Sequence, residues 1–211
     1  MKVIQPSVQI LSNINGNEIL KHLEMCGRVC YKSEDKISDV SNEKFLQGII
    51  KRGHEAVLEH YNITVKFICD RGVSHEIVRH RMASYCQEST RYCNYMKEKF
   101  GNEITVIQPC FFEKDSREYF IWERNMECCE KAYFDLLDCG CSPQQARCVL
   151  PNSLKTEIIM TANIREWRHF LKLRCSKAAH PQMIEVAFKV LTEFHLNIPV
   201  LFDDIWEEVY G

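Results

Sequence analysis

The stretch YNITVKFIC, residues 61–69, shows most clearly which kind of fold this chain adopts. It is rich in β-branched and aromatic residues, and apolar side chains recur at every second position. One face would carry Ile63, Val65, Phe67 and Cys69, and the other Asn62, Thr64, Lys66 and Ile68. Because side chains alternate across a strand, the stretch predicts a half-buried β-strand.

Outward from this strand, helix and strand signals follow one another without regular alternation. Directly after it, residues 72–83 form a helix candidate that leads into a polar run from Ser84 to Arg91. Further strands are predicted at 3–11, at 103–108 before Pro109, and at 156–163. Further helices are predicted at 17–26, 42–52, 115–139, from Ser142-Pro143, at 164–175 and at 181–197.

This order of elements predicts an α+β fold. We expect mixed helices around a central, mainly antiparallel sheet, in a single domain over residues 1–211 with one long helical segment at 115–139. The apolar faces of 115–139 and 181–197 suit either an internal core or a seam between subunits.

Composition excludes some classes of partner. The chain has 211 residues, of which 45% are hydrophobic and 27% charged, and its net charge is −2. This charge argues against duplex nucleic acid as the main partner, because that role needs a broadly basic face. The start lacks a signal-peptide pattern, and no window holds the ~18 to 20 apolar residues of a membrane span, so we expect a cytoplasmic protein.

The twelve cysteines show no C-x-x-C spacing, so we expect reduced thiols that act as small hydrophobic side chains, with a zinc site as the alternative. His54 and His60, with Glu55 and Glu59, also raise the question of a metal. The zinc-protease helix needs histidines four residues apart, and position 58 is Leu58. We therefore predict no metal site.

The segment RHRMASYCQESTRY, residues 79–92, concentrates basic and hydroxyl side chains. One interpretation is a helix C-terminus whose cations complement the macrodipole, followed by a solvated loop. However, consecutive helical residues point ~100° apart, so Arg79, His80 and Arg81 cannot share one solvated face. A cation that points inward needs an anionic partner, and phosphate suits a guanidinium group.

At this point a resemblance becomes specific. Arg79-His80-Arg81, seven residues and then Ser89 are similar to the signature of the flavin-dependent thymidylate synthases. The likeness extends from about residue 28 to 185. It includes Ser84, Gln87, Glu88, Arg91 and Tyr92; Arg28 to Tyr31; Gly53-His54-Glu55 with Glu59-His60; Ala146-Arg147 with Leu150-Pro151; and Asn163 to Arg165 with His169-Phe170 and Leu173-Arg174.

The resemblance implies an enzyme that converts dUMP to dTMP. Methylenetetrahydrofolate would supply the carbon and FAD the reducing equivalents, with NADPH reloading the flavin. It implies a homotetramer whose active sites are shared between subunits, with no nucleic acid or membrane partner. The implied FAD ligands are Ala56, Arg79, His80, Arg81 and Gln87 and, from another subunit, Asn163, Ile164, Arg165 and His169.

The same comparison implies a dUMP site in which arginines and Ser89 contact the phosphate. Its residues would be Glu76, Ile77, Val78, Arg79, Gln87, Glu88, Ser89, Thr90, Arg91, Arg147 and Arg174. Ser89 is expected to be a phosphate ligand, because no base beside it is identifiable that would activate it as a nucleophile.

Arg174 has support from the sequence itself. Ile164, Trp167, Phe170, Leu171 and Arg174 fall at helical spacing, which puts this arginine on the apolar face. A snorkelling arginine at a helix end is one interpretation. The resemblance implies instead a catalytic arginine that favours the N3-deprotonated uracil, a more electron-rich nucleophile at C5, so that no enzyme nucleophile is needed.

Three residues depart from the family pattern. Ala56 stands where threonine or serine is frequent, Cys86 replaces a common asparagine, and Cys30 replaces a serine.

Two other classes of protein compete with the enzyme. A regulatory nucleotide-binding module would need the phosphate arginines but neither Arg174 nor the set from Asn163 to His169. A nucleic-acid-binding helix would need a second basic element, which the sequence lacks.

Overall fold

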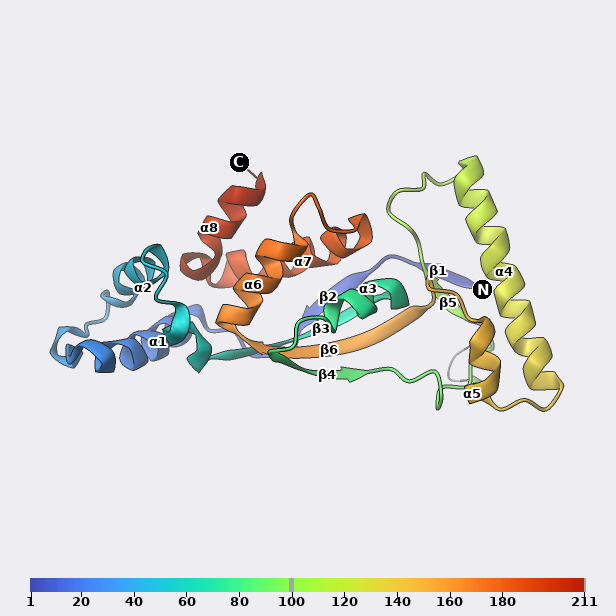
Figure 1. The fold of residues 1–211 in the computed structure, drawn as a ribbon, viewed down its shortest axis with the longest axis horizontal. Helices are drawn as coiled ribbons and strands as arrows, with labels where there is room; N and C mark the ends of the chain where they lie inside the picture. Colours follow the sequence, from blue (N-terminus) through green and yellow to red (C-terminus); the bar gives the residue numbers. More distant parts are fainter. Residues whose placement is uncertain (99–100, 211) are drawn as a thin grey trace. The chain divides into compact units, whose positions relative to one another are not determined.

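The computed structural model describes residues 1–98 and 101–210, and its α+β class confirms the prediction (Figure 1). The chain forms two compact units. Unit 1 comprises Met1–Ser7, Phe67–Arg79 and Cys86–Ile159, and unit 2 comprises Val8–Lys66, His80–Tyr85 and Met160–Gly211. The prediction of one domain over residues 1–211 stays a prediction.

A four-stranded antiparallel sheet has the strand order β2-β3-β6-β4. Its strands are β2 (Ser7–Ile10), β3 (Asn62–Asp70), β4 (Ala83–Gln87) and β6 (Lys155–Asn163). The apolar face predicted for β3 is confirmed, because Ile63, Val65, Phe67 and Cys69 are all 0% exposed. β3, β4 and β6 each contribute residues to both units. The strands of this sheet therefore supply residues to both units.

Unit 1 is organised around one long helix, α4 (Arg117–Asp138). Ser116 caps it by accepting a hydrogen bond from the Tyr119 N–H, and the chain turns away at Gly140, whose φ is +88°. Trp122, Met126 and Tyr133 of α4 pack into a core with the second sheet, formed by parallel β1 (Lys2–Ile4) and β5 (Thr105–Ile107). The predicted apolar face of 115–139 thus serves an internal core.

Within the described residues, unit 1 also holds the short elements α3 (Arg71–Ile77), α5 (Pro143–Ala146) and η4 (Arg147–Val149). Unit 2 holds α1 (Gly16–Tyr31), η1 (Glu34–Lys36), α2 (Asn42–Lys51), η2 (Glu55–His60), α6 (Ile164–Arg174), α7 (Pro181–Asn197) and α8 (Pro199–Tyr210).

Aromatic side chains hold the C-terminal helices of unit 2 together. Trp167 of α6 lies edge-on to Phe194 of α7 at 5.4 Å, and Phe194 meets Phe202 of α8 at 5.0 Å. The Trp167 indole N–H also donates to the Ile63 carbonyl oxygen at 3.0 Å, which fixes α6 against β3. Helix α6 is therefore rigidly placed, and it carries several of the predicted site residues.

Three elements differ from the predictions. The strand predicted at 3–11 is two strands, β1 and β2, because Pro6 between them has no N–H for a ladder. The helix predicted at 72–83 ends at Ile77, and β4 takes up the last residue of that predicted helix and residues 84–87 of the predicted polar run. Pairing of this segment with β6 overrides its local helix pattern. Helix α8 was not predicted; Pro199, at its first position, begins it.

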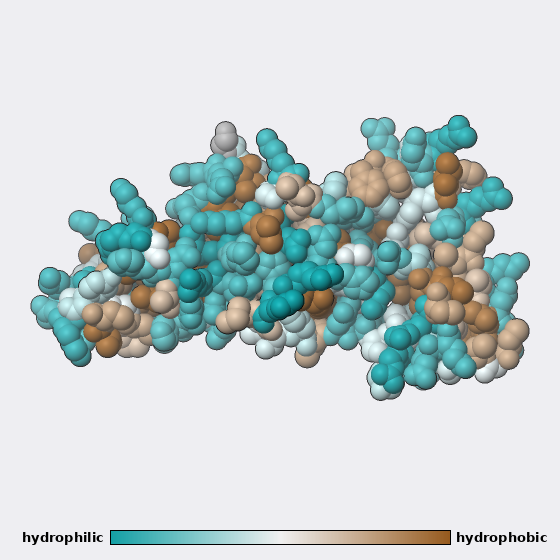
Figure 2. All heavy atoms as spheres, in the orientation of Figure 1, coloured by the Kyte–Doolittle hydropathy of each residue, from teal (hydrophilic) through white to brown (hydrophobic). Residues whose placement is uncertain are grey.

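Within residues 1–98 and 101–210, no helix combines the length and apolar character needed to cross a bilayer. Figure 2 shows hydrophobic residues interspersed with hydrophilic ones over the visible part of α4. Phe120 and Ile121 of this helix are 61% and 59% exposed. None of the twelve cysteines, all of which the structure describes, is in a disulfide; Cys69 and Cys175 are buried, and burial raises the pKa of the Cys175 thiol to about 12. Burial suits these two to the predicted role of small hydrophobic side chains.

Candidate functional site

The predicted site residues divide between the two units. Unit 1 holds most of the predicted dUMP ligands: Glu76, Ile77, Val78, Arg79, Gln87, Glu88, Ser89, Thr90, Arg91 and Arg147. Unit 2 holds most of the predicted flavin ligands, together with the predicted catalytic arginine: Ala56, His80, Arg81, Asn163, Ile164, Arg165, His169 and Arg174. Ile77 and Ile164 are 0% exposed, so only their backbone could face a ligand.

In unit 1, the turn after β4 lies against the α5–η4 segment. The Arg91 Nε donates to the Gln144 amide oxygen at 3.3 Å, and an Arg147 Nη donates to the Thr90 hydroxyl at 3.5 Å. Both arginines are exposed. In the part of the chain that the structure describes, neither guanidinium group is paired with a carboxylate. Two uncompensated cations therefore flank one turn.

Ser89 begins that turn. Its carbonyl oxygen accepts from the Tyr92 and Cys93 N–H groups, and its hydroxyl oxygen accepts from the Arg91 N–H at 3.3 Å. The hydroxyl proton can then point to a ligand. No histidine or carboxylate hydrogen-bonds this hydroxyl within the described residues, which suits the predicted ligand role.

Gln87 and Glu88, in contrast, are held by internal partners. The Gln87 amide donates to the Ser74 and Thr156 hydroxyl oxygens at 2.9 and 3.3 Å. The Glu88 carboxylate pairs with the Lys155 ammonium at 3.0 Å, and both line a cavity of about 320 Å³. Burial lowers the pKa of Lys155, but its bonds to carboxylates outweigh this and raise the pKa overall. Lys155 was not among the predicted site residues.

The inward-pointing basic residue of the signature is His80. It is 4% exposed, whereas Arg79 and Arg81 are exposed beyond the end of α3. The His80 Nδ1 lies 3.0 Å from the Glu166 carboxylate, and its Nε2 lies 3.1 Å from the Arg174 Nε. The expected anionic partner of the inward residue is therefore supplied by the protein itself.

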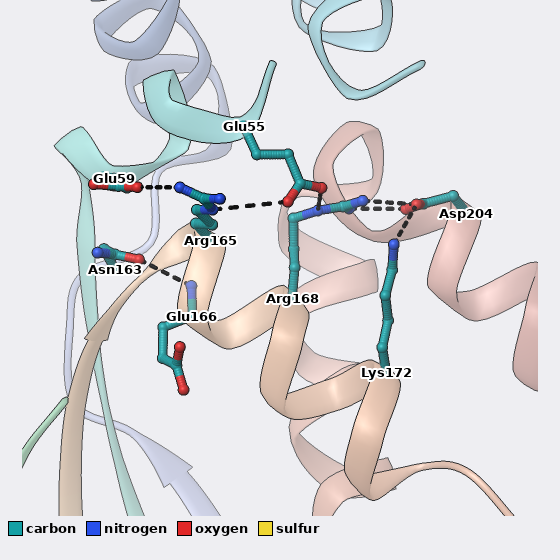
Figure 3. Close-up of polar contacts among 8 residues, drawn as sticks. All are labelled: Glu55, Glu59, Asn163, Arg165, Glu166, Arg168, Lys172 and Asp204. Carbon is teal, nitrogen blue, oxygen red and sulfur yellow. Dashed lines mark hydrogen bonds and ion pairs between the residues drawn. The ribbon is translucent and has the colours of Figure 1, made fainter. Parts of the chain in front are cut away.

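A cavity of about 420 Å³ in unit 2 gathers three predicted flavin ligands, Asn163, Arg165 and His169. Asn163 caps α6 by accepting from the Glu166 N–H at 2.9 Å. Arg165 is about half exposed and pairs with Glu59 at 2.5 Å (Figure 3). Ala56 is exposed in η2, the same 3₁₀ helix that carries Glu59.

The wall of this cavity contains an ion-pair network that the sequence reasoning missed (Figure 3). Arg168 is 1% exposed and makes two bonds to the Asp204 carboxylate, at 2.8 and 2.7 Å. Its Nε lies 3.5 Å from Glu55, and Lys172 lies 3.6 Å from Asp204. The Glu166 carboxylate points away from these guanidinium groups in Figure 3. Glu166 therefore belongs to the His80 contacts and not to this network.

Potential metal ligands also meet here, because donor atoms of His80, Glu166 and His169 lie within 4.8 Å of one another. The Arg174 guanidinium group beside His80 places a positive charge next to any bound cation, which opposes metal binding. His54, the other histidine considered from the sequence, is hydrogen-bonded to the Tyr31 hydroxyl at 2.9 Å.

Comparison with known proteins identifies the relatives of this chain. The family described as thymidylate synthase complementing protein (Thy1) matches residues 13–200, a range that includes every predicted site residue. The flavin-dependent thymidylate synthase of Pyrococcus furiosus is 38% identical over 163 residues, which cover 77% of this chain and 66% of that protein. The protein of the same name from Geobacter sulfurreducens is 34% identical over 187 residues, covering 85% and 79%.

The fold also has a counterpart among solved structures. The crystal structure of the UMP/dUMP methylase PolB from Streptomyces cacaoi, bound with 5-Br dUMP, matches with a TM-score of 0.77. The match covers 96% of each chain at 21% sequence identity, which is a likeness of fold.

Proposed function

Because the chain belongs to the thymidylate synthase complementing protein family, we propose that it methylates dUMP to dTMP with methylenetetrahydrofolate as the carbon donor. By its family and its relatives the chain is an enzyme, a flavin-dependent thymidylate synthase. The proposal adds that the flavin is FAD, that NADPH reduces it, and that dUMP, folate and FAD meet in a homotetramer with shared sites.

The observation that carries the proposal is the arrangement around Ser89. Arg91 and Arg147 lie against one turn, exposed and without a carboxylate partner in the described residues, beside a serine hydroxyl. Guanidinium groups and a hydroxyl are suited to a phosphate monoester, which accepts several charge-assisted hydrogen bonds. We assign this arrangement to the dUMP phosphate, with Arg79 as a further cation.

The unit 2 cavity is suited to part of a flavin dinucleotide. Its volume, about 420 Å³, lies within the range of ligand pockets. Arg165 can bind a pyrophosphate oxygen, because its partners Glu55 and Glu59 are 27% and 44% exposed and can turn into solvent. Asn163 and His169 add polar contacts. The flavin, when bound, supplies the hydride; the protein residues bind and orient it.

Assembly into a tetramer is also part of the proposal. Phe120 and Ile121 of α4 are exposed, and large exposed apolar side chains suit a contact between subunits. The inward face of the same helix is already used by the core of unit 1. A monomer at working concentration would contradict this part.

The decisive experiment uses the purified protein itself. We expect a yellow preparation that releases FAD on denaturation and whose flavin absorption changes when dUMP is added. With methylenetetrahydrofolate and NADPH it should convert dUMP to dTMP. A colourless protein that cannot be loaded with FAD would refute the proposal. If that protein still binds dUMP, a regulatory nucleotide-binding module is favoured instead.

Substitution of Ser89 by alanine is expected to weaken dUMP binding about 10-fold and to leave turnover measurable. The loss corresponds to one hydrogen bond to a charged oxygen, roughly 1.5 kcal/mol. The measurement is KM and kcat for dUMP, with Ser7→Ala on β2 as the matched control. Complete loss of turnover with unchanged dUMP affinity would instead indicate that Ser89 is a nucleophile.

A further inference from the structure

Three side chains of unit 2 form a hydrogen-bonded series. The Glu166 carboxylate lies 3.0 Å from His80 Nδ1, and His80 Nε2 lies 3.1 Å from Arg174 Nε. Glu166 is in the first turn of α6 and Arg174 is its last residue. Eight residues span about 12 Å along a helix, so these two side chains are joined through the imidazole ring between them. His80 is therefore the link between the two ends of α6.

The donor and acceptor roles in this series follow from chemistry. A guanidinium group can only donate, so His80 Nε2 must be the acceptor of the Arg174 bond. An imidazole that accepts at Nε2 is neutral and carries its one proton on Nδ1. That proton is then donated to the Glu166 carboxylate, which is a suitable acceptor. The geometry thus selects one protonation state and one tautomer of His80.

The surroundings favour the same state. Burial lowers the pKa of His80, and the neighbouring Arg174 and His169 lower it too, although Glu166 acts in the opposite direction. The ring is fixed edge-on to Phe170 at 4.8 Å, and the Tyr85 hydroxyl donates to the His80 carbonyl oxygen. A protonated His80 would place a second cation against Arg174 and would lose the acceptor that holds it. The ring is therefore held in both position and charge.

We propose that Glu166 and His80 are positioning residues that fix the guanidinium plane of Arg174 for its contact with the uracil ring. The inference rests on the proposed function, because it is that function which gives Arg174 its role. Both ring nitrogens of His80 are bonded to protein groups, so the inference assigns its imidazole to Arg174, while the predicted contact of His80 with the flavin stays a prediction.

The first test does not depend on turnover. Nitrogen NMR of the FAD-loaded protein labelled with ¹⁵N-histidine should show His80, assigned by its loss in His80→Gln, as the neutral tautomer protonated at Nδ1 near neutral pH. In Glu166→Ala that tautomer should no longer dominate. A His80 protonated at Nε2, or at both nitrogens, would overturn the inference even if the protein makes dTMP.

The second test measures kcat. Glu166→Ala should lower kcat about 10- to 100-fold, the range typical of residues that orient an active group through another. Glu166→Gln, whose amide oxygen can still accept from Nδ1, should recover part of the loss at unchanged FAD content. Glu193→Ala, an exposed glutamate of α7, is the matched control. Equal kcat in Glu166→Ala and Glu193→Ala would overturn the inference, whereas absence of turnover in the unmodified protein would overturn the proposed function.

Discussion

Replacement of Arg174 by alanine is expected to lower dTMP formation by about 1,000-fold or more, while FAD stays bound. The guanidinium group is partly buried on the apolar face of α6, and its Nε is held by His80. A preorganised cation in such surroundings stabilises developing negative charge far better than water does. In the proposed reaction that charge would be the deprotonated N3 of uracil, whose formation makes C5 a better nucleophile.

The measurement is single-turnover dTMP formation alongside the flavin-to-protein ratio. Because high pH also deprotonates N3, raising the pH should restore part of the activity of Arg174→Ala. Arg174→Lys keeps the charge but not the planar donor, so it should retain only a small fraction of turnover. Near-normal turnover in Arg174→Ala at neutral pH would contradict the catalytic assignment.

The parts of the fold that the sequence predicts well are those with strong local periodicity. The strand at 61–69 and the helices at 164–175 and 181–197 are present with nearly the predicted bounds. In each of these elements, apolar residues recur on one face over at least two helical turns or four alternate strand positions. Because that face is buried in the fold, tertiary contacts stabilise the same structure that the local pattern favours. The partly buried position of Arg174 on α6 was predicted in the same way.

The segment after α3 could not be predicted from its own residues. Its helical pattern continues past Ile77, but residues 83–87 pair with β6, about 75 positions further along the chain. Likewise, the sequence indicated that one cationic residue of the signature points inward, but its partner Glu166 lies 86 positions away. Only the folded structure shows that the inward residue is His80, which is bonded to Glu166, and not an arginine that would need a phosphate as its partner.

Arg168 is a different case, since its signal was present in the sequence. It stands four residues after Ile164 and three before Leu171, so helical spacing alone puts it on the buried face of α6. Its carboxylate partner, Asp204, belongs to α8, which was not predicted. An arginine at helical spacing on the buried face of a helix therefore implies an acidic partner on the element that covers that face.

Replacement of Asp204 by alanine should therefore destabilise the protein markedly. Both Nη atoms of the buried Arg168 donate to this carboxylate. Without the carboxylate, the guanidinium group keeps as acceptors the Leu201 carbonyl oxygen and the more distant Glu55. Unpairing a buried charge costs several kcal/mol, but Asp204 is itself 44% exposed, so we expect a loss of about 2 to 3 kcal/mol in the free energy of unfolding.

The matched control is the neighbouring residue, Asp203→Ala. Asp203 pairs with His195 at 3.1 Å and is 46% exposed, so its loss should cost less than about 1 kcal/mol. Urea denaturation at equal flavin content measures both variants; equal losses would contradict the buried-pair argument.

The pH dependence of Asp204 gives a second check. Burial raises its pKa, but the bonds from Arg168 outweigh burial and hold the pKa below the ordinary value of 3.8. A carboxyl group with a lowered folded pKa contributes its stability above the unfolded value and loses it as the pH falls through the folded one. The difference between the wild type and Asp204→Ala should therefore be full at neutral pH and shrink below about pH 4. A difference that stays constant down to pH 2 would mean that packing, and not the ion pair, is what Asp204 contributes.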